Sequence, residues 1–511
     1  MLVRALLLAF TVTFIAPLIP ASAKRTAYAS AVATDPPLPS PSSSSQRPVR
    51  SAATFASASE GSLRSIAVSS TLGSKPGGSD VGFFNPKRRV GRDLVVLSVA
   101  EWLVEETVRN GGGNDCVSQR RSSPVTLLDA TCAAGAQGLR IAVESTALAR
   151  SYISGEQTGT SGGCSDDEWR GKGDPPELDV ILNDADEAAA DLAEKNAATV
   201  LSDMEAVLMA ASGGEERTDL PRIDVTRRYA QAALHESPHD VTVLDPFGST
   251  APFLDAAFAR APHRGLVEIC ATDVGALFGS RPAVTRRHYG SGACSGVGTT
   301  ASAGRPPCYR ERGVRLLLAE AAKAAARHDK GILPTWAVST EHYVLASVRT
   351  VRGARRADEA MRWVRNVRIC QACGAAWAAN GPTCSCTRSP GTGADAEQEW
   401  TLWTGPIYDD TVVRTMVSMA NSIKSGGTIS KQTYALLSKI RGESAIGGSV
   451  LFHRRPGVAS GNKTPRLDDV ISELERRGHT AARTHFDSKA LRSNATPQEF
   501  DLAVIAAVAR N

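Results

Sequence analysis

Residues 239–257 read HDVTVLDPFGSTAPFLDAA, and this stretch decides the fold class. The apolar run Val241–Leu244 is typical of a buried strand, and a helical pattern, APFLDAAFARA, starts at residue 251. Three similar runs, VTLLDAT, LDVILNDAD and GLVEICATDV, alternate with helical stretches. This alternation predicts an α/β fold whose parallel sheet is covered by helices on both faces. In such sheets, ligands bind beyond the carboxyl ends of the strands.

Two of the other predicted strands also end in polar residues. Asp129 closes the first strand, and Gly135 and Gly138 follow in the loop before a helix. The second strand ends in Asn183 and Asp184. Glycines let the backbone approach a nucleotide-like ligand, and a carboxylate at the next strand end commonly accepts hydrogen bonds from ribose hydroxyls. A tight turn and a helix N-cap are the plain structural alternatives. Together the two ends favour an adenosine-type cofactor, either a dinucleotide or S-adenosylmethionine.

The tetrapeptide Asp245-Pro246-Phe247-Gly248 separates these two cofactors. It suits a methyltransferase acting on an exocyclic base amine, because Asp245 can accept a hydrogen bond and then the proton of that poor nucleophile. Pro246 directs a carbonyl acceptor, and Phe247 offers a ring on which an extruded base stacks. Gly248 lets the chain turn sharply. An Asp-Pro turn with a core phenylalanine remains the alternative. A nicotinamide-dependent oxidoreductase would require a full G-x-G-x-x-G motif, which the sequence lacks.

A cysteine cluster, CQACGAAWAANGPTCSC, spans residues 370–386. Four thiolates at a C-x-x-C and C-x-C spacing predict a small structural zinc knuckle, and reduced thiols without metal are the alternative. The expected ligands are Cys370, Cys373, Cys384 and Cys386. Ten cysteines in 511 residues are too few for a disulfide scaffold. The net charge of +5 permits a nucleic-acid partner without arguing for one.

The N-terminal region resembles a targeting segment. Residues 1–23 form a signal-like segment with an apolar run, and residues 24–80 are rich in Ser, Ala and Arg, which predicts a transit-like disordered segment. The pair favours a two-step presequence for a plastid, with a mitochondrial or nuclear location as the alternative and no stable membrane association after its removal. A plain secretory signal with a disordered linker is the other interpretation.

From about residue 83 to its end, the chain resembles the tRNA guanine-N2 dimethyltransferases that modify the base between the D-arm and the anticodon arm, guanosine 26. The resemblance is carried by an ordered set of motifs: FFNPKRRVGRDL, LDPFGSTAPFLDAA, ATDVGALFGSRP, RRHYG, RERGVRLLLAEAAKAA, STEHYV, the cysteine cluster, LWTGPIYDD and RTHFDSKALRS. It implies a class I (Rossmann-like) methyltransferase domain that uses S-adenosylmethionine, a C-terminal α+β domain, and transfer of two methyl groups to N2 of one guanosine.

The same resemblance assigns site residues. Arg92 matches the family's cofactor-contacting arginine, Asp184 its ribose acid and Asp245 its catalytic carboxylate. In the glycine-rich loop only the second of the family's two arginines is kept, as Arg140. The cofactor-binding set is therefore Arg92, Asp129, Gly135, Arg140, Asp184 and Ala230, and the catalytic set is Asp245, Pro246 and Phe247.

The loop around Ala230 departs from the family. Relatives carry Asp-Ala-Asn there, whereas this chain has Tyr229-Ala230-Gln231 and lacks the acid expected to hold the adenine amine. This is the one feature that favours a catalytically inactive, RNA-binding methyltransferase fold as the alternative function.

The expected layout is a methyltransferase domain over residues 81–330 and a tRNA-binding domain over residues 331–511, in a monomer. In the latter, Lys and Arg are interleaved with His485 and Phe486, a pattern that suits a surface contacting phosphates or a solvated helix face.

Overall fold

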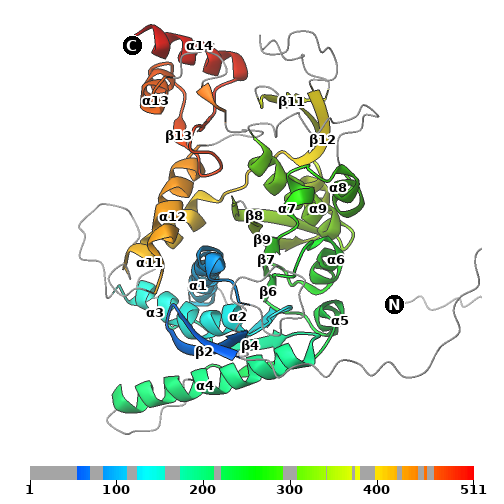
Figure 1. Cartoon of the computed structure of the whole chain (residues 1–511), viewed down its shortest axis with the longest axis vertical. Helices are drawn as coiled ribbons and strands as arrows, with labels where there is room; N and C mark the ends of the chain where they lie inside the picture. Colours follow the sequence, from blue (N-terminus) through cyan, green and yellow to red (C-terminus); the bar gives the residue numbers. More distant parts are fainter. Residues whose placement is uncertain are drawn as a thin grey trace, which may run out of the picture. The chain divides into compact units, whose positions relative to one another are not determined.

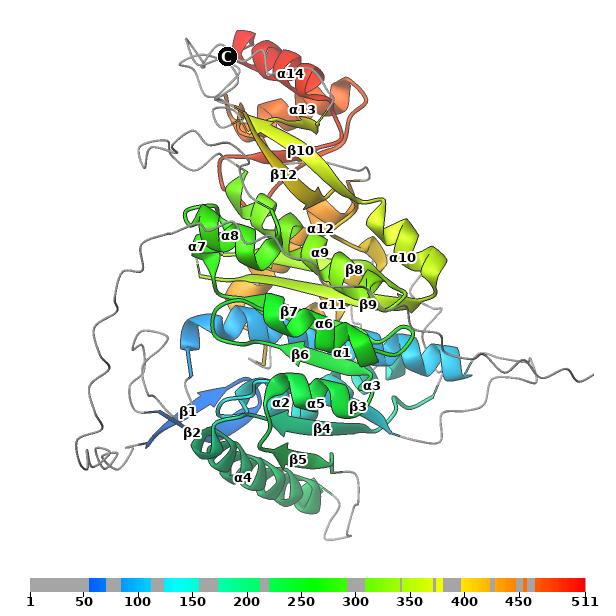
Figure 2. The same cartoon turned by 90° about the vertical axis from the view of Figure 1, so that its right-hand side faces the viewer.

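The computed structural model describes residues 55–69, 84–111, 124–155, 173–211, 220–291, 308–340, 342–370, 374–379, 397–422, 428–446, 454–456 and 465–510. Residues Ala52–Asn511 form one compact unit. Its centre is a seven-stranded sheet with the strand order β5-β4-β3-β6-β7-β9-β8, which runs from bottom to top in Figure 2.

Five neighbouring strands of this sheet are parallel. In sheet order they are β5 (Ile223–Thr226), β4 (Leu178–Asn183), β3 (Val125–Asp129), β6 (Val241–Leu244) and β7 (Leu266–Ala271). Four of them are the strands that the sequence predicts. The α/β prediction with a parallel sheet is thus confirmed.

Helices cover both faces of the sheet (Figure 1). One face packs against α1 (Arg89–Gly111), α3 (Thr146–Ser154) and α4 (Glu187–Ala211), and the other against α5 (Ala230–Glu236), α6 (Ala251–Arg260) and α9 (Tyr309–Ala326). Successive strand residues point to opposite faces, so Leu127 joins the first core and Leu128 the second. Between β3 and α3, α2 (Ala136–Arg140) continues into one π-helical turn, Ile141–Ser145.

The predicted domain boundary between residues 330 and 331 is wrong. It falls inside β8 (Lys330–Ser339), which pairs antiparallel with β9 (Val344–Arg352), and β9 pairs antiparallel with β7. Two further helices, α11 (Asp410–Ser422) and α12 (Lys431–Ser444), place apolar side chains such as Met416 in the core beside α1. The apolar faces of β8, β9, α11 and α12 are therefore buried against the parallel strands and their helices.

The prediction of disorder for residues 24–80 is wrong over residues 55–69. There, β1 (Phe55–Glu60) and β2 (Leu63–Ser69) form an antiparallel hairpin. Ile66 and Val68 of β2 are buried in the first core, and Asn196 of α4 bonds both the amide and the carbonyl of Ala67. Apolar burial and these hydrogen bonds outweigh the entropy that the composition would otherwise favour. Residues 1–54 lie outside the described ranges, so the presequence remains a prediction.

The rest of the C-terminal part is small α+β structure. It comprises α10 (Ala354–Met361), β10 (Val364–Cys370), β11 (Ala376–Ala378), β12 (Glu397–Trp403), α13 (Leu467–Arg476), β13 (Ala481–Arg483), β14 (Leu491–Ser493) and α14 (Pro497–Ala509). Strands β11, β10 and β12 form one antiparallel sheet, and β13 pairs with β14. The helices α13 and α14 enclose a third core around Phe500.

Buried ion pairs connect the C-terminal strand β14 to the helices α9 and α12. Arg492 of β14 contacts Glu311 of α9 at 2.9 Å and Glu443 of α12 at 3.0 Å, and all three side chains are buried. His485 Nδ1 lies 2.6 Å from Glu443, and Phe486 is 1% exposed. The prediction that His485 and Phe486 lie on a phosphate-contacting surface is therefore wrong, because both side chains are enclosed where these elements meet.

None of the helices in the described ranges combines the length and apolar character that crossing a bilayer requires.

Candidate active site

Three carboxylates meet at the carboxyl ends of β3, β4 and β6. Asp129 is paired in register with Leu182 of β4 and with Val243 of β6, so Asp184 and Asp245, two residues beyond each, lie at the same edge. We call these three residues the acidic edge. Burial, then the charge of Asp245 and more weakly that of Asp184, raises the pKa of Asp129 to about 7. The structure thus brings these three predicted site residues to one edge of the sheet.

Two of these carboxylates hold the loop after β3 in place. Asp129 Oδ2 accepts a hydrogen bond from the Gly138 amide at 3.1 Å, and Asp184 Oδ2 accepts one from the Ala133 amide at 2.9 Å. Gly135 has φ of 79°, and a Cβ at Gly138 would lie 2.3 Å from the Leu182 side chain. A larger residue would be strained at Gly135 because of its positive φ, and at Gly138 because its Cβ would clash with Leu182.

Asn183, at the end of β4, is a structural residue whose role the sequence did not reveal. It is buried, and its Nδ2 donates to the carbonyls of Ala130 and Arg228, both at 3.0 Å. Its Oδ1 accepts from Thr226 Oγ1 at 2.8 Å. Asn183 thus ties together the chain segments that follow β3, β4 and β5. Its place beside Asp184 was visible in the sequence, but its partners were not.

Ala230 begins α5 beyond the end of β5, at the same side of the sheet as the acidic edge. Its side chain is buried, whereas the preceding Tyr229 is 79% exposed. Ala230 therefore keeps its place at a strand end, and its contact with a cofactor remains a prediction.

The two arginines of the predicted cofactor set face a carboxylate of the N-terminal hairpin. Arg92 Nε and Nη2 lie 2.6 and 2.5 Å from the two oxygens of Glu60. Arg140 is fully buried and contacts Glu60 at 3.0 Å, Asp93 at 2.7 Å and Glu144 at 2.8 Å. Their cofactor contacts remain predictions. Glu60 was missed because the composition around it is typical of a transit peptide.

Asp245 and the residues after it form the open part of the site. The Asp245 side chain is 29% exposed, Pro246 is buried, and the Phe247 ring is 58% exposed. Gly248 adopts φ of 87°, and its amide donates to Thr272 Oγ1 at 2.7 Å. The turn that the sequence predicts therefore places a partly exposed carboxylate and an exposed aromatic ring two residues apart in the chain.

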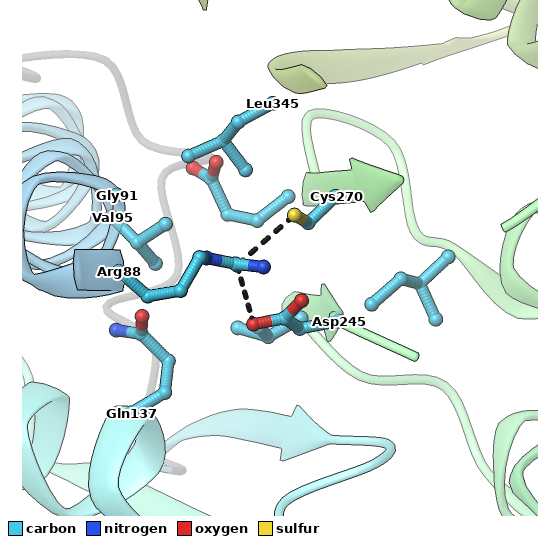
Figure 3. A pocket seen from close by; sticks show the side chains of 10 residues that line it. Arg88, Gly91, Val95, Gln137, Asp245, Cys270 and Leu345 are labelled. Carbon is cyan, nitrogen blue, oxygen red and sulfur yellow. Dashed lines mark hydrogen bonds and ion pairs between the residues drawn. The ribbon is translucent and has the colours of Figure 1, made fainter. Parts of the chain in front are cut away.

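A pocket lies beneath Asp245 (Figure 3). It is a small hollow lined by Arg88, Gly91, Val95, Gln137, Val243, Leu244, Asp245, Glu268, Cys270 and Leu345. Arg88 Nη2 lies 2.6 Å from Asp245 Oδ2 and 3.0 Å from Cys270 Sγ. The buried Gln137 Nε2 has no hydrogen-bond partner among the described residues, which suits a pocket that takes a polar ligand.

Glu268 of β7 is a fully buried carboxyl group in this pocket wall. Its Oε1 accepts hydrogen bonds from Ser98 at 2.7 Å and Ser347 at 2.8 Å. Burial raises the pKa of Glu268 to about 8, against the opposing effect of these hydrogen bonds. Glu268 is therefore mostly protonated at pH 7.

We expect Glu268→Gln to flatten the dependence of stability on pH. Between its ordinary pKa near 4.5 and about 8, the folded protein binds a proton that the unfolded chain has lost, so the free energy of unfolding falls as pH rises. The slope is at most about 1.4 kcal/mol per pH unit. Urea unfolding of both proteins at pH 5.5 and pH 7.5 measures it. Equal pH dependence in the two proteins would contradict this assignment.

Of the four predicted zinc ligands, only Cys370 lies in the described ranges; Cys373, Cys384 and Cys386 fall outside them. Within those ranges, no group of three or more potential metal ligands occurs. Cys370 is buried at the end of β10, where its amide donates to Ala375 O and its carbonyl accepts from Gly374 N, both at 2.9 Å. The backbones of Gly374 and Ala375 thus lie against that of Cys370.

The parallel sheet, the helices on both faces and the acidic edge define the class of the protein, a Rossmann-like methyltransferase. The chain belongs to the N2,N2-dimethylguanosine tRNA methyltransferase family, whose sequence profile matches residues 173–504. The family resemblance inferred from the motifs is thereby confirmed.

Relatives and a solved structure agree with this family. The tRNA (guanine(26)-N(2))-dimethyltransferase of Methanopyrus kandleri is 27% identical over 441 residues, 85% of this chain and 93% of that protein. The tRNA (guanine(27)-N(2))-dimethyltransferase of Rattus norvegicus is 29% identical over 57% of this chain, and the match spans only 33% of its length. The structure of Trm1 from Pyrococcus horikoshii with S-adenosyl-L-methionine has a TM-score of 0.60 and 23% identity, covering 88% of this chain and 99% of that one. That similarity supports the fold.

Proposed function

We propose that this chain transfers methyl groups from S-adenosylmethionine to the exocyclic N2 of a guanosine in tRNA, giving N2-methyl- and N2,N2-dimethylguanosine. The observation that carries the proposal is the partly exposed Asp245 carboxylate at the acidic edge, with the exposed Phe247 ring two residues further along the chain. A base extruded from tRNA would stack on Phe247 and present its amine to Asp245. Family membership supplies the acceptor, guanine N2.

The residues at the acidic edge fit an adenosine-type methyl donor. Gly135 and Gly138 keep the loop after β3 close to the sheet, Asp184 lies partly exposed at the next strand end, and Gln137 offers an unpaired amide. When bound there, S-adenosylmethionine supplies an electrophilic methyl group on a sulfonium sulfur. A hydrogen bond from a ribose hydroxyl to Asp184 would orient that group.

The chain's own contribution to the reaction is orientation and proton acceptance. The N2 lone pair forms a bond to the methyl carbon as the carbon–sulfur bond breaks, and Asp245 accepts the proton that leaves N2. The ring of Pro246 restricts the backbone, so its carbonyl oxygen has a fixed direction and can accept a hydrogen bond from the second hydrogen of the amine. The neutral sulfide then leaves, and a second round adds the second methyl group.

The alternative, a catalytically inactive RNA-binding protein of the same fold, has less support. It rests on Tyr229 in place of an acid, whereas the carboxylate, the turn and the aromatic ring at residues 245–248 are all retained. A nicotinamide-dependent oxidoreductase gives no role to an exposed Asp-Pro-Phe turn.

Incubation with methyl-labelled S-adenosylmethionine and unmodified tRNA, followed by nucleoside analysis, tests the proposal. We expect label in N2-methylguanosine first and in N2,N2-dimethylguanosine later. The relatives act at guanosine 26 or 27, and the family resemblance implies position 26 here, so mapping the modified nucleotide decides the position. Protein that binds tRNA without transferring label would favour the inactive alternative.

We further propose one structural zinc ion, held by Cys370, Cys373, Cys384 and Cys386. The C-x-x-C and C-x-C spacing supports it, as do the backbone hydrogen bonds of Cys370 with Gly374 and Ala375. A structural zinc should contribute to the free energy of folding. We expect about one equivalent of zinc per chain and a lower melting temperature for Cys373→Ser. Cys132→Ser, at a buried cysteine in the loop after β3, serves as the control. Less than about half an equivalent of zinc in purified protein would contradict the proposal.

A further inference from the structure

Arg88 is a buried arginine at the catalytic carboxylate. It ends the short 3-10 helix Pro86–Arg88, whose start is fixed because Asn85 Oδ1 accepts a hydrogen bond from the Lys87 amide at 3.0 Å. The Arg88 guanidinium lies 4.4 Å from the centroid of the Tyr343 ring, and its side chain is 13% exposed. The position of Arg88 is thus fixed by its short helix and by the Tyr343 ring against which its guanidinium packs.

The nearest anion to Arg88 is Asp245. Arg88 Nη2 lies 2.6 Å from Asp245 Oδ2, and the other polar groups around it are neutral at pH 7. Burial raises the pKa of the Cys270 thiol well above its usual range and that of Tyr343 to about 12. Glu268, in the same pocket, is mostly protonated for the reason given above. The Arg88 cation therefore depends on Asp245 for its counter-charge.

The two side chains differ in exposure. Arg88 reaches Asp245 and Cys270 from the start of α1 and is 13% exposed, whereas the Asp245 side chain is 29% exposed (Figure 3). An aspartate carboxylate can rotate about its terminal side-chain torsion, for which a broad range of angles is allowed. A charge-assisted hydrogen bond to one oxygen limits that rotation.

We propose that Arg88 is a positioning residue for the methylation reaction: it holds Oδ2 of Asp245 from within the pocket and so orients the exposed side of the carboxylate toward the guanine amine. The inference rests on the proposed function. In this proposal Arg88 acts through Asp245, to which it is hydrogen-bonded, and not by contact with the base or the methyl donor. The contrary idea is that Arg88 is a plug, which occupies the amine's place and has to leave before the base binds.

Steady-state kinetics of Arg88→Met and Arg88→Lys separate the two ideas. Misplacement of a reacting group commonly costs up to about 100-fold in rate, so we expect Arg88→Met to lower kcat by about 10- to 100-fold. KM for tRNA and the calorimetric affinity for S-adenosylmethionine should change less than about threefold. Arg88→Lys should recover part of kcat, because it keeps a charge but loses the planar fork. Lys87→Met, an exposed change on the same turn, is the matched control.

Two results would overturn the proposal. A wild-type kcat in Arg88→Met, or a lower KM for tRNA with an equal or higher kcat, would identify Arg88 as a plug or as irrelevant to the reaction. Should Arg88→Met fail to fold, Arg88→Lys decides: it keeps the charge but loses the planar fork, so a wild-type kcat in that variant would contradict the proposal. Failure of the proposed function itself is distinct, because wild-type protein would then transfer no methyl group to guanine N2 in the same assay.

Discussion

Replacement of Asp245 by asparagine is expected to lower the rate of methyl transfer by about 10²- to 10⁴-fold, the usual contribution of a positioned proton acceptor. Asparagine has nearly the same shape, but its amide cannot take the proton that leaves guanine N2. Asp245 lies beyond β6 and faces Arg88 and solvent, whereas the residues expected to hold the donor follow β3 and β4. The affinity for S-adenosylmethionine should therefore stay nearly unchanged.

Single-turnover assays and calorimetric titration of the same preparation test both parts of this prediction. Asparagine is preferred to alanine because its side-chain oxygen can still accept the hydrogen bond from Arg88, although either substitution removes the negative charge. Asp224→Asn, an exposed change on β5, is the matched control. A rate above about a tenth of wild type would contradict the role of Asp245 as the proton acceptor.

The second large effect concerns the N-terminal hairpin. Arg140→Met should lower the free energy of unfolding by about 3–5 kcal/mol, the typical cost of removing one partner from a buried ionic cluster. The fully buried Arg140 contacts three carboxylates, those of Glu60, Asp93 and Glu144. Without it, these buried acids lose their shared cation. The same change should release the hairpin, since Glu60 would keep only Arg92.

Urea unfolding measures the stability change, and hydrogen exchange of residues 55–69 measures release of the hairpin. Arg227→Met is the control: Arg227 also contacts two carboxylates, Asp191 and Glu194, but at the surface. That change should leave the free energy of unfolding almost unchanged, because water screens exposed pairs. Equal stability loss in the two variants would show that the buried cluster does not anchor the hairpin.

The parallel strands and the acidic edge were predictable because both follow from local patterns. Short apolar runs alternate with helical stretches, and a polar residue at the end of each parallel strand must lie at one edge of the sheet. Asp129, Asp184 and Asp245 needed no knowledge of distant contacts. Phe247 was likewise predicted by the turn that contains it.

The misplaced elements depend on partners far away in the sequence. Residues 55–69 look like a transit peptide, and contacts with Arg92, Arg140 and α4, including the hydrogen bonds of Asn196, hold them as a strand pair. The antiparallel pairing of β9 with β7 is set by the hairpin that β9 forms with β8. Arg88 lies 157 residues from Asp245, and no local pattern marks it as the partner of that carboxylate.

The most direct test of the central claim uses tRNA in which the target guanosine is replaced by inosine. Inosine keeps N1 and O6 of guanine but lacks the 2-amino group that Asp245 is proposed to serve. After incubation with methyl-labelled S-adenosylmethionine, we expect tRNA with guanosine to be labelled and the inosine form to bind the protein but to gain no label at that position. Label in the inosine-containing tRNA at a comparable rate would contradict methylation of the exocyclic amine.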